Sequence, residues 1–165
     1  MHKVYMLISL MVQFFPDRHY VEHALKVYGY AGAIGGGEGL GDDELAILEA
    51  ATVIHDIGIP DAVRLYGSGA GPFQEKEGAR IAPTMLIEVG YTREQTKRAV
   101  WLVGHHHSSE CAGEDFLLQI LLEADELVNL SEGNASHAKI AQSRETLFKT
   151  ATGLRYLDKL FPPEV

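Results

Sequence analysis

Histidine and aspartate side chains on otherwise apolar segments are the groups of this sequence best suited to hold a metal ion. His55 and Asp56 are adjacent near the end of the apolar run Ala50–Gly58. Neighbouring residues of an α-helix point about 100° apart, so both side chains can contact one ion at a helix end. An ionised aspartate in so apolar a stretch is costly to bury unless a cation compensates its charge. Taken alone, the pair fits equally well a histidine and an aspartate that cap each other or the chain end.

Three other positions carry ligand-type side chains among apolar neighbours. His23, taken alone, is more typical of a core histidine with a backbone partner than of a ligand. His105, His106 and His107 end an expected helix, where consecutive side chains fan out and at most two can face one centre. The remainder are expected to act as cations at the helix C-terminus or as donors to the ligands. Asp125 lies on an apolar helix face, which predicts a cation as its partner.

The elements that must position these side chains are all predicted to be helices. Apolar residues recur at helical spacing, capping residues precede the runs, and alternating strand patterns with hairpin turns are missing. Helices are expected at residues 4–12, 17–33, 42–58, 73–89, 92–106, 114–130 and about 136–152, with a loop at 66–72. Short connections then favour a compact all-α bundle of six or seven helices.

Composition limits the classes of protein and of partner. The 165 residues are 46% hydrophobic, and no linker-like stretch interrupts them, so one domain over residues 1–165 is expected, with its motifs in a core of 18–130. The net charge of −9 disfavours nucleic-acid polymers and anionic membrane surfaces as partners. A lone Cys111 allows no intrachain disulfide and no cysteine-based zinc site, which favours a cytoplasmic protein.

The apolar run at residues 4–12 is predicted to form a buried first helix that Pro16 ends. A secretory signal peptide is the alternative, but no small-residue cleavage site follows the run. The run is also shorter than the roughly 20 residues that a membrane-spanning helix needs.

In chain order the candidate residues read His, then His-Asp, then a histidine cluster, then Asp, and this pattern resembles the HD-domain superfamily of metal-dependent phosphohydrolases. The resemblance implies an all-α HD-domain fold. It also implies that a first divalent metal is held by four side chains, namely His23, His55, Asp56 and Asp125. In relatives with two metals the HD aspartate bridges the ions, and His106 and His107 correspond to the paired histidines that serve the second ion. His105 is then a donor beside the ligands.

The implied cofactor is one or two divalent transition-metal ions. Mixed imidazole and carboxylate ligands suit Fe, Mn, Co, Ni or Zn equally well. Many binuclear relatives have a histidine four residues before a Gly-Ala pair, whereas this chain has Gln74 before Gly78-Ala79. Glu75 or Glu77 could supply a carboxylate in its place, and a solvated charged first turn is an equally good interpretation of the two glutamates.

The implied reaction is attack of a metal-activated water on a small phosphate ester or anhydride, with a nucleotide as the expected substrate. Asp56, His106 and His107 are the expected catalytic residues, a histidine of the cluster donating a proton to the leaving oxygen or holding the phosphoryl group. Substrate contacts are assigned to three cations, although for each a solvated surface position is about twice as favoured: Arg18, Arg64 and Lys76.

Three other functions compete with this one. A diiron oxygenase on the same fold needs four histidines and two aspartates, and Gln74 counts against it. A nucleotide or metal sensor without turnover is disfavoured because every first-metal ligand is present. A structural helical module would leave several charges unpaired on apolar faces, so it is the least favoured.

Overall fold

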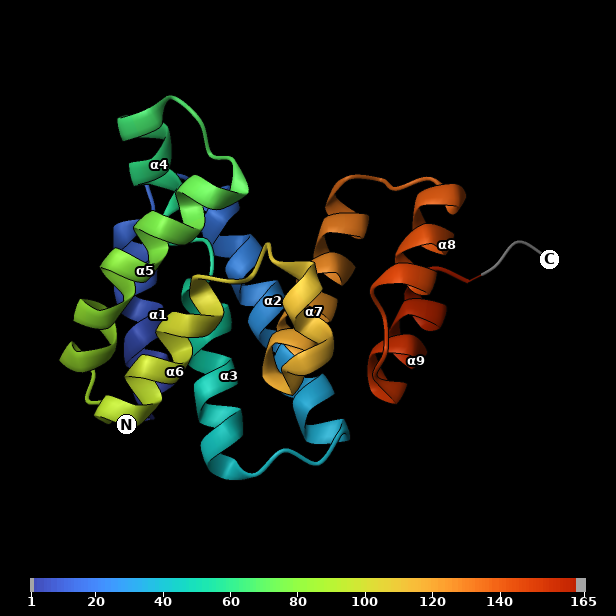
Figure 1. Ribbon diagram of the computed structural model, residues 1–165, viewed down its shortest axis with the longest axis horizontal. Helices are drawn as coiled ribbons and strands as arrows, with labels where there is room; N and C mark the ends of the chain where they lie inside the picture. Colours follow the sequence, from blue (N-terminus) through green and yellow to red (C-terminus); the bar gives the residue numbers. More distant parts are fainter. Residues whose placement is uncertain (1, 163–165) are drawn as a thin grey trace.

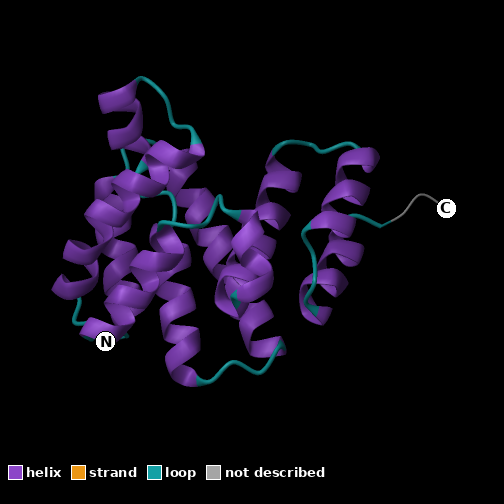
Figure 2. Cartoon of the chain, in the orientation of Figure 1, coloured by secondary structure: helices purple, strands orange, loops and turns teal. Residues whose placement is uncertain are grey.

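Helices form nearly all the regular structure in residues 2–162, the part of the chain that the computed structural model describes (Figure 1). Figure 2 shows them joined by loops and turns, with no strand among the described residues. The predicted all-α class is therefore confirmed. The outer limits of the expected domain, residue 1 and residues 163–165, lie outside the described residues.

The described part of the chain contains nine α-helices and one short 3₁₀ helix, η1. Their bounds are α1 Lys3–Phe14, α2 Arg18–Gly37, α3 Asp42–Ile54, α4 Ile59–Tyr66, α5 Gly71–Glu88, α6 Arg93–Val103, η1 Ser109–Glu114, α7 Phe116–Glu132, α8 His137–Thr146 and α9 Ala151–Leu160.

Two differences account for the nine helices where six or seven were expected. No helix is expected between residues 58 and 73, but α4 forms there with Pro60 in its first turn, where a proline is well tolerated. The single helix expected at about 136–152 is two helices. α8 ends at Thr146, and Thr150 begins α9 by accepting a hydrogen bond from the backbone N–H of Gly153. In addition, α2 continues past the expected end at residue 33 through the glycines at 35–37, and Gly37 is its last residue.

The centre of the bundle is α3, which packs against α1, α2, α6 and α7 (Figure 1). Its last turns are buried on every side, from Ala50 to Ile54, because the segment is apolar all round and other helices surround it. The chain therefore carries His55 and Asp56 straight into the interior at the end of α3.

The first apolar run forms α1, which ends at Phe14 before Pro16 and buries Val4, Leu7 and Met11 in the core. The predicted first helix forms and ends before Pro16, but it is buried on one face only. Among the described residues, no helix combines the length and the apolar character that crossing a membrane requires.

A buried carboxylate joins α7 to the C-terminal hairpin of α8 and α9. Glu123 is fully buried, and it accepts hydrogen bonds from the Gln119 amide, from the backbone N–H groups of Lys149 and Thr150, and from the Thr150 hydroxyl. Four donors compensate the buried charge, so the hairpin connection is fixed against α7.

The turn that follows Asp56 is packed directly on α5. Gly58 begins α4, and a Cβ atom at this position would overlap the backbone of Gln74 and Gly78. The absence of a side chain at Gly58 thus lets α5 approach the end of α3 closely.

Replacing Gly58 by alanine should destabilise the protein, because two backbone segments must move apart to admit the methyl group. We expect Gly58→Ala to lower the free energy of unfolding by about 1–3 kcal/mol in urea denaturation. Gly36→Ala is the matched control, since Gly36 is helical and a Cβ there meets open space. The control should gain up to about 1 kcal/mol. Equal stability of the two variants would contradict the close approach.

Candidate metal centre

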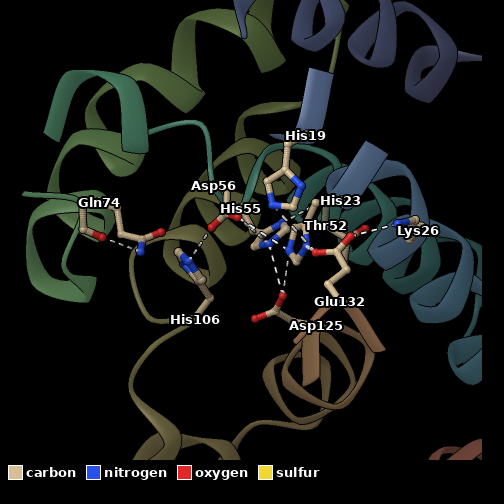
Figure 3. Close-up of polar contacts among 11 residues, drawn as sticks. His19, His23, Lys26, Thr52, His55, Asp56, Gln74, His106, Asp125 and Glu132 are labelled. Carbon is tan, nitrogen blue, oxygen red and sulfur yellow. Dashed lines mark hydrogen bonds and ion pairs between the residues drawn. The ribbon is translucent and has the colours of Figure 1, made fainter. Parts of the chain in front are cut away.

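Five side chains from four parts of the chain converge beside the end of α3 (Figure 3). His23 comes from α2, His55 and Asp56 follow α3, His106 follows α6, and Asp125 comes from α7. Their separation in sequence reaches 102 residues between His23 and Asp125, whose side chains are 3.0 Å apart. The fold thus assembles the set that the sequence pattern singled out.

Asp56 lies between two groups of potential ligands. Its Oδ2 is 3.4 Å from Nε2 of His55 and 3.7 Å from Nε2 of His23, while its Oδ1 is 3.4 Å from Nε2 of His106. The ligand atoms of His23, His55 and Asp56 lie within 4.8 Å of one another, and so do those of Asp56, His106 and His107. One carboxylate can therefore serve both groups, one oxygen to each.

Asp125 belongs to the first of these groups. Its Oδ1 is 3.0 Å from Nε2 of His23 and 3.6 Å from Nε2 of His55. Two imidazole nitrogens lie near both carboxylates, a donor set that suits a divalent transition metal.

Backbone carbonyls fix the orientation of the two most deeply buried imidazoles. Nδ1 of His55 donates to the carbonyl of Thr52 over 2.8 Å, and Nδ1 of His106 donates to that of Val103 over 2.7 Å. Each Nε2 then faces the cluster, and neither has a hydrogen-bond partner among the described residues. A buried ring nitrogen without a partner is unusual, and it is the arrangement that a metal ligand requires, so these residues fit a divalent ion.

His23 is oriented by Glu132, a residue that the sequence analysis missed. Nδ1 of His23 is 3.0 Å from a Glu132 oxygen, and the other oxygen accepts a hydrogen bond from Lys26 over 2.9 Å (Figure 3). Glu132 lies seven residues after Asp125, hence two turns along the same face of α7. That spacing was the available signal.

Burial and the facing carboxylates act against each other on the pKa of the histidines. Burial lowers the pKa of His55, but the nearby carboxylates of Asp56 and Asp125 outweigh it and raise the pKa to about 9. Burial likewise lowers the pKa of His23, and its hydrogen bond with Asp125 turns the balance upward. In the metal-free protein His55 therefore holds a proton at neutral pH where a cation would otherwise lie.

The same balance acts on the aspartates with opposite sign. Burial raises the pKa of Asp56, but His55 and then His106 bring it below its ordinary value. The pKa of Asp125 is lowered as well, because its contacts with His23 and His55 outweigh burial. Both aspartates are therefore ionised at neutral pH and can act as ligands. His107 differs, since burial and the neighbouring His106 lower its pKa.

The other three residues expected near the second ion make their main contacts outside the five clustered side chains. Glu77 is 3% exposed, and its oxygens accept hydrogen bonds from the Tyr66 hydroxyl and the Arg80 guanidinium. Glu75 accepts a hydrogen bond from the backbone N–H of His107, so it contacts the loop and contributes to its position. His105 stacks on the Trp101 ring with 4.3 Å between centroids. Of these three, only Glu75 touches a residue of the cluster.

The three cations assigned to the substrate have partners of their own. Arg18 lies 3.3 Å from Glu22 with 87% of its side chain exposed, Arg64 pairs with Asp61 on α4, and the Lys76 ammonium lies over the Tyr66 ring. Of the three, Arg18 is the closest in sequence to a proposed ligand, because it begins α2, the helix that carries His23. Their roles stay predictions.

Comparison with known families agrees with the site and the fold. The HD domain family matches residues 20–130, about two thirds of the chain, and the chain belongs to this family. Searches of curated proteins and of solved structures found no match. HD-domain proteins are in general metal-dependent phosphohydrolases. The match covers the predicted motif core and includes all five clustered side chains.

Metal binding should depend on pH because the ion and a proton compete for the same ring nitrogens. With the pKa of His55 raised to about 9, binding at neutral pH must displace a proton. We expect the apparent affinity for Mn²⁺ or Co²⁺ to rise from pH 6.5 to 9 and to level off above it. Calorimetry in two buffers of different ionisation enthalpy would measure the released protons. An affinity that does not change over this range would contradict the assignment.

Glu132→Gln should weaken metal binding without removing a ligand. The variant keeps the size of the side chain but loses the charge that holds Nδ1–H of His23. Loss of such an outer contact costs about 10- to 100-fold in metal affinity. Glu22→Gln is the control, since Glu22 is also on the surface and pairs with Arg18. Unchanged affinity in Glu132→Gln would show that His23 needs no such support.

Proposed function

We propose that this protein is a metal-dependent phosphohydrolase that acts on a small phosphate ester or anhydride, with a nucleotide as the preferred substrate class. The observation that carries the proposal is the position of Asp56, whose two oxygens face two histidine groups containing buried, unpartnered Nε2 atoms. Membership of the HD domain family supports the same reaction class.

The ligands of a first divalent ion in this proposal are His23, His55, Asp56 and Asp125, and those of a second are Asp56, His106 and His107. A divalent ion at such a site lowers the pKa of a bound water and stabilises negative charge on phosphoryl oxygens. The protein's part is to fix the ligands, to hold Asp56 between the two groups, and to keep the histidines oriented through the carbonyls of the preceding turns.

Exposure indicates which residues meet the substrate. His55 and His106 are buried, whereas Asp56 and Asp125 are partly exposed and His107 is exposed. A phosphate that enters from solvent therefore reaches His107 first. With its pKa lowered, His107 is neutral at pH 7 and keeps one N–H, so we assign it a hydrogen bond to the phosphoryl or leaving-group oxygen.

The charge distribution favours a small substrate over a polymer. The net charge of −9 repels extended polyanions, while bound divalent ions would offset Asp56 and Asp125 at the centre. Arg18, Arg64 and Lys76 remain the proposed cations for phosphate contact, and each would have to exchange its present partner for the substrate.

Removal of the shared carboxylate tests the proposal. Asp56→Ala should lose bound metal, and phosphate release should fall to the uncatalysed background, while helix content stays near that of the wild type. The measurements are metal analysis of the purified protein and phosphate release from a panel of nucleotides and sugar phosphates with Mn, Co, Ni, Fe and Mg. Asp158→Ala is the control, since Asp158 pairs with Arg144 on the C-terminal hairpin.

Full metal content in Asp56→Ala would overturn the proposal. Release of phosphate from no substrate, together with a diiron spectrum, would assign the protein to the oxygenases of this fold. Nucleotide or metal binding without turnover in the wild type would identify a sensor.

A further inference from the structure

We infer that the side-chain oxygen of Gln74 is a ligand at the second metal position, beside Asp56, His106 and His107. The inference rests on the proposed function, because it requires that the cluster binds metal. It extends that proposal to Gln74, which stands where many binuclear relatives have a histidine and whose amide is not an expected ligand in the sequence analysis.

Gln74 lies on α5 between two glycines that pack closely against residues of the metal centre. Gly71 lies against His107, since a Cβ atom there would be 3.0 Å from Cγ of the imidazole. Gly78 lies against the end of α3, where a Cβ atom would be 3.8 Å from the His55 carbonyl oxygen. Residues 71, 74 and 78 share one face of the helix, so the Gln74 side chain lies on the face that covers the site.

The hydrogen bonds of the amide fix which of its atoms faces the site. Nε2 of Gln74 donates to the carbonyl of Gly69 over 3.0 Å. Because a carbonyl can only accept, the amide cannot be turned round without placing two acceptors together. Oε1 must therefore point away from Gly69, and in Figure 3 the amide is directed toward His106 and Asp56.

The amide oxygen is buried and has no partner. Gln74 is 6% exposed, and its Oε1 accepts no hydrogen bond from any described residue. Nε2 of His55 and Nε2 of His106 are likewise buried and make no hydrogen bond to a described residue. An orphaned acceptor costs about 1–3 kcal/mol, which a cation or its bound water would recover.

The chemistry of an amide ligand sets the properties of the second position. The first group contains two carboxylates, whereas the second shares Asp56 and adds a neutral oxygen from Gln74. Fewer charges predict weaker binding, so the two positions should fill in order as the metal concentration rises. An uncharged oxygen also shifts the preference toward harder ions, among which Mn²⁺ accepts imidazole as well.

The alternative role for Gln74 is to anchor the loop at Gly69 through Nε2 alone, and two substitutions separate the roles. Gln74→Leu removes both the oxygen and the donor. Gln74→Glu also loses the donor to Gly69, but it keeps the oxygens and adds a charge. A ligand role predicts opposite effects of the two variants on the second ion, whereas an anchoring role predicts the same effect.

The experiment is a Mn²⁺ titration of metal-free protein, followed by the electron paramagnetic resonance of free Mn²⁺ and by calorimetry. We expect two ions in the wild type with separate affinities. Gln74→Leu should weaken the second by about 10- to 100-fold and leave the first unchanged, while Gln74→Glu should bind the second more tightly than the wild type. Gln119→Leu is the control, because Gln119 is also buried but contacts Glu123.

A single Mn²⁺ in the wild type, or a second ion bound no more tightly by Gln74→Glu, would overturn the inference and leave the proposed function standing. Absence of any bound Mn²⁺ in the wild type would instead count against the proposed function. Thermal unfolding of each variant is measured alongside, and Gln74→Glu decides the question if Gln74→Leu does not fold.

Discussion

The concentration of ionisable groups at the buried end of α3 is the constraint on which the structure depends. Two aspartates and three imidazoles share a space that apolar helices surround, and burial alone disfavours the charged form of each. They are tolerated because opposite charges face one another at 3.0–3.7 Å. Positive charge at this point therefore stabilises the buried aspartates, and the proton on His55 supplies it in the absence of metal.

The supports of the imidazoles come from the helices themselves. Carbonyl groups near the ends of α3 and α6 lack partners in the helix, and those of Thr52 and Val103 accept from His55 and His106. The ends of the two helices thus orient the rings without additional side chains. His23 lies in the middle of α2, where carbonyls are already used, so a side chain from another helix, Glu132, has to perform this task.

Site residues that stand out against their own sequence neighbours can be predicted from sequence, whereas those defined by a contact with another helix are harder to predict. His23, His55, Asp56 and Asp125 could be found because charged or chelating side chains stand out on apolar faces. Glu132 gives a weaker signal, its position two turns after Asp125 on the same face of α7, because a glutamate near a helix end is also ordinary on a surface. Only the contact with His23 on α2 shows its role. Glu77 combines both cases, because its ion pair with Arg80, three residues later on α5, follows from helical spacing, whereas its hydrogen bond with Tyr66 does not.

The helix boundaries show a similar limit. Pro60 marks the start of a helix as readily as an end, and the break at residues 147–150 depends on the partnership of that connection with Glu123. The class of fold, by contrast, follows from helical periodicity along the whole chain, which is a property of many residues at once.

The hydrogen bonds of Glu123 connect the helix that carries Asp125 to residues beyond the HD domain match. The family match ends at residue 130, but three of the four hydrogen bonds that compensate this carboxylate come from Lys149 and Thr150. Glu123 lies two residues before Asp125 on the same helix, with its side chain toward the hairpin and that of Asp125 toward the histidines. A fragment that ends at the family boundary would leave the Glu123 carboxylate buried in α7 without these hydrogen bonds, two residues from the proposed ligand Asp125. In this chain, the smallest fragment that can keep its centre intact includes the C-terminal hairpin.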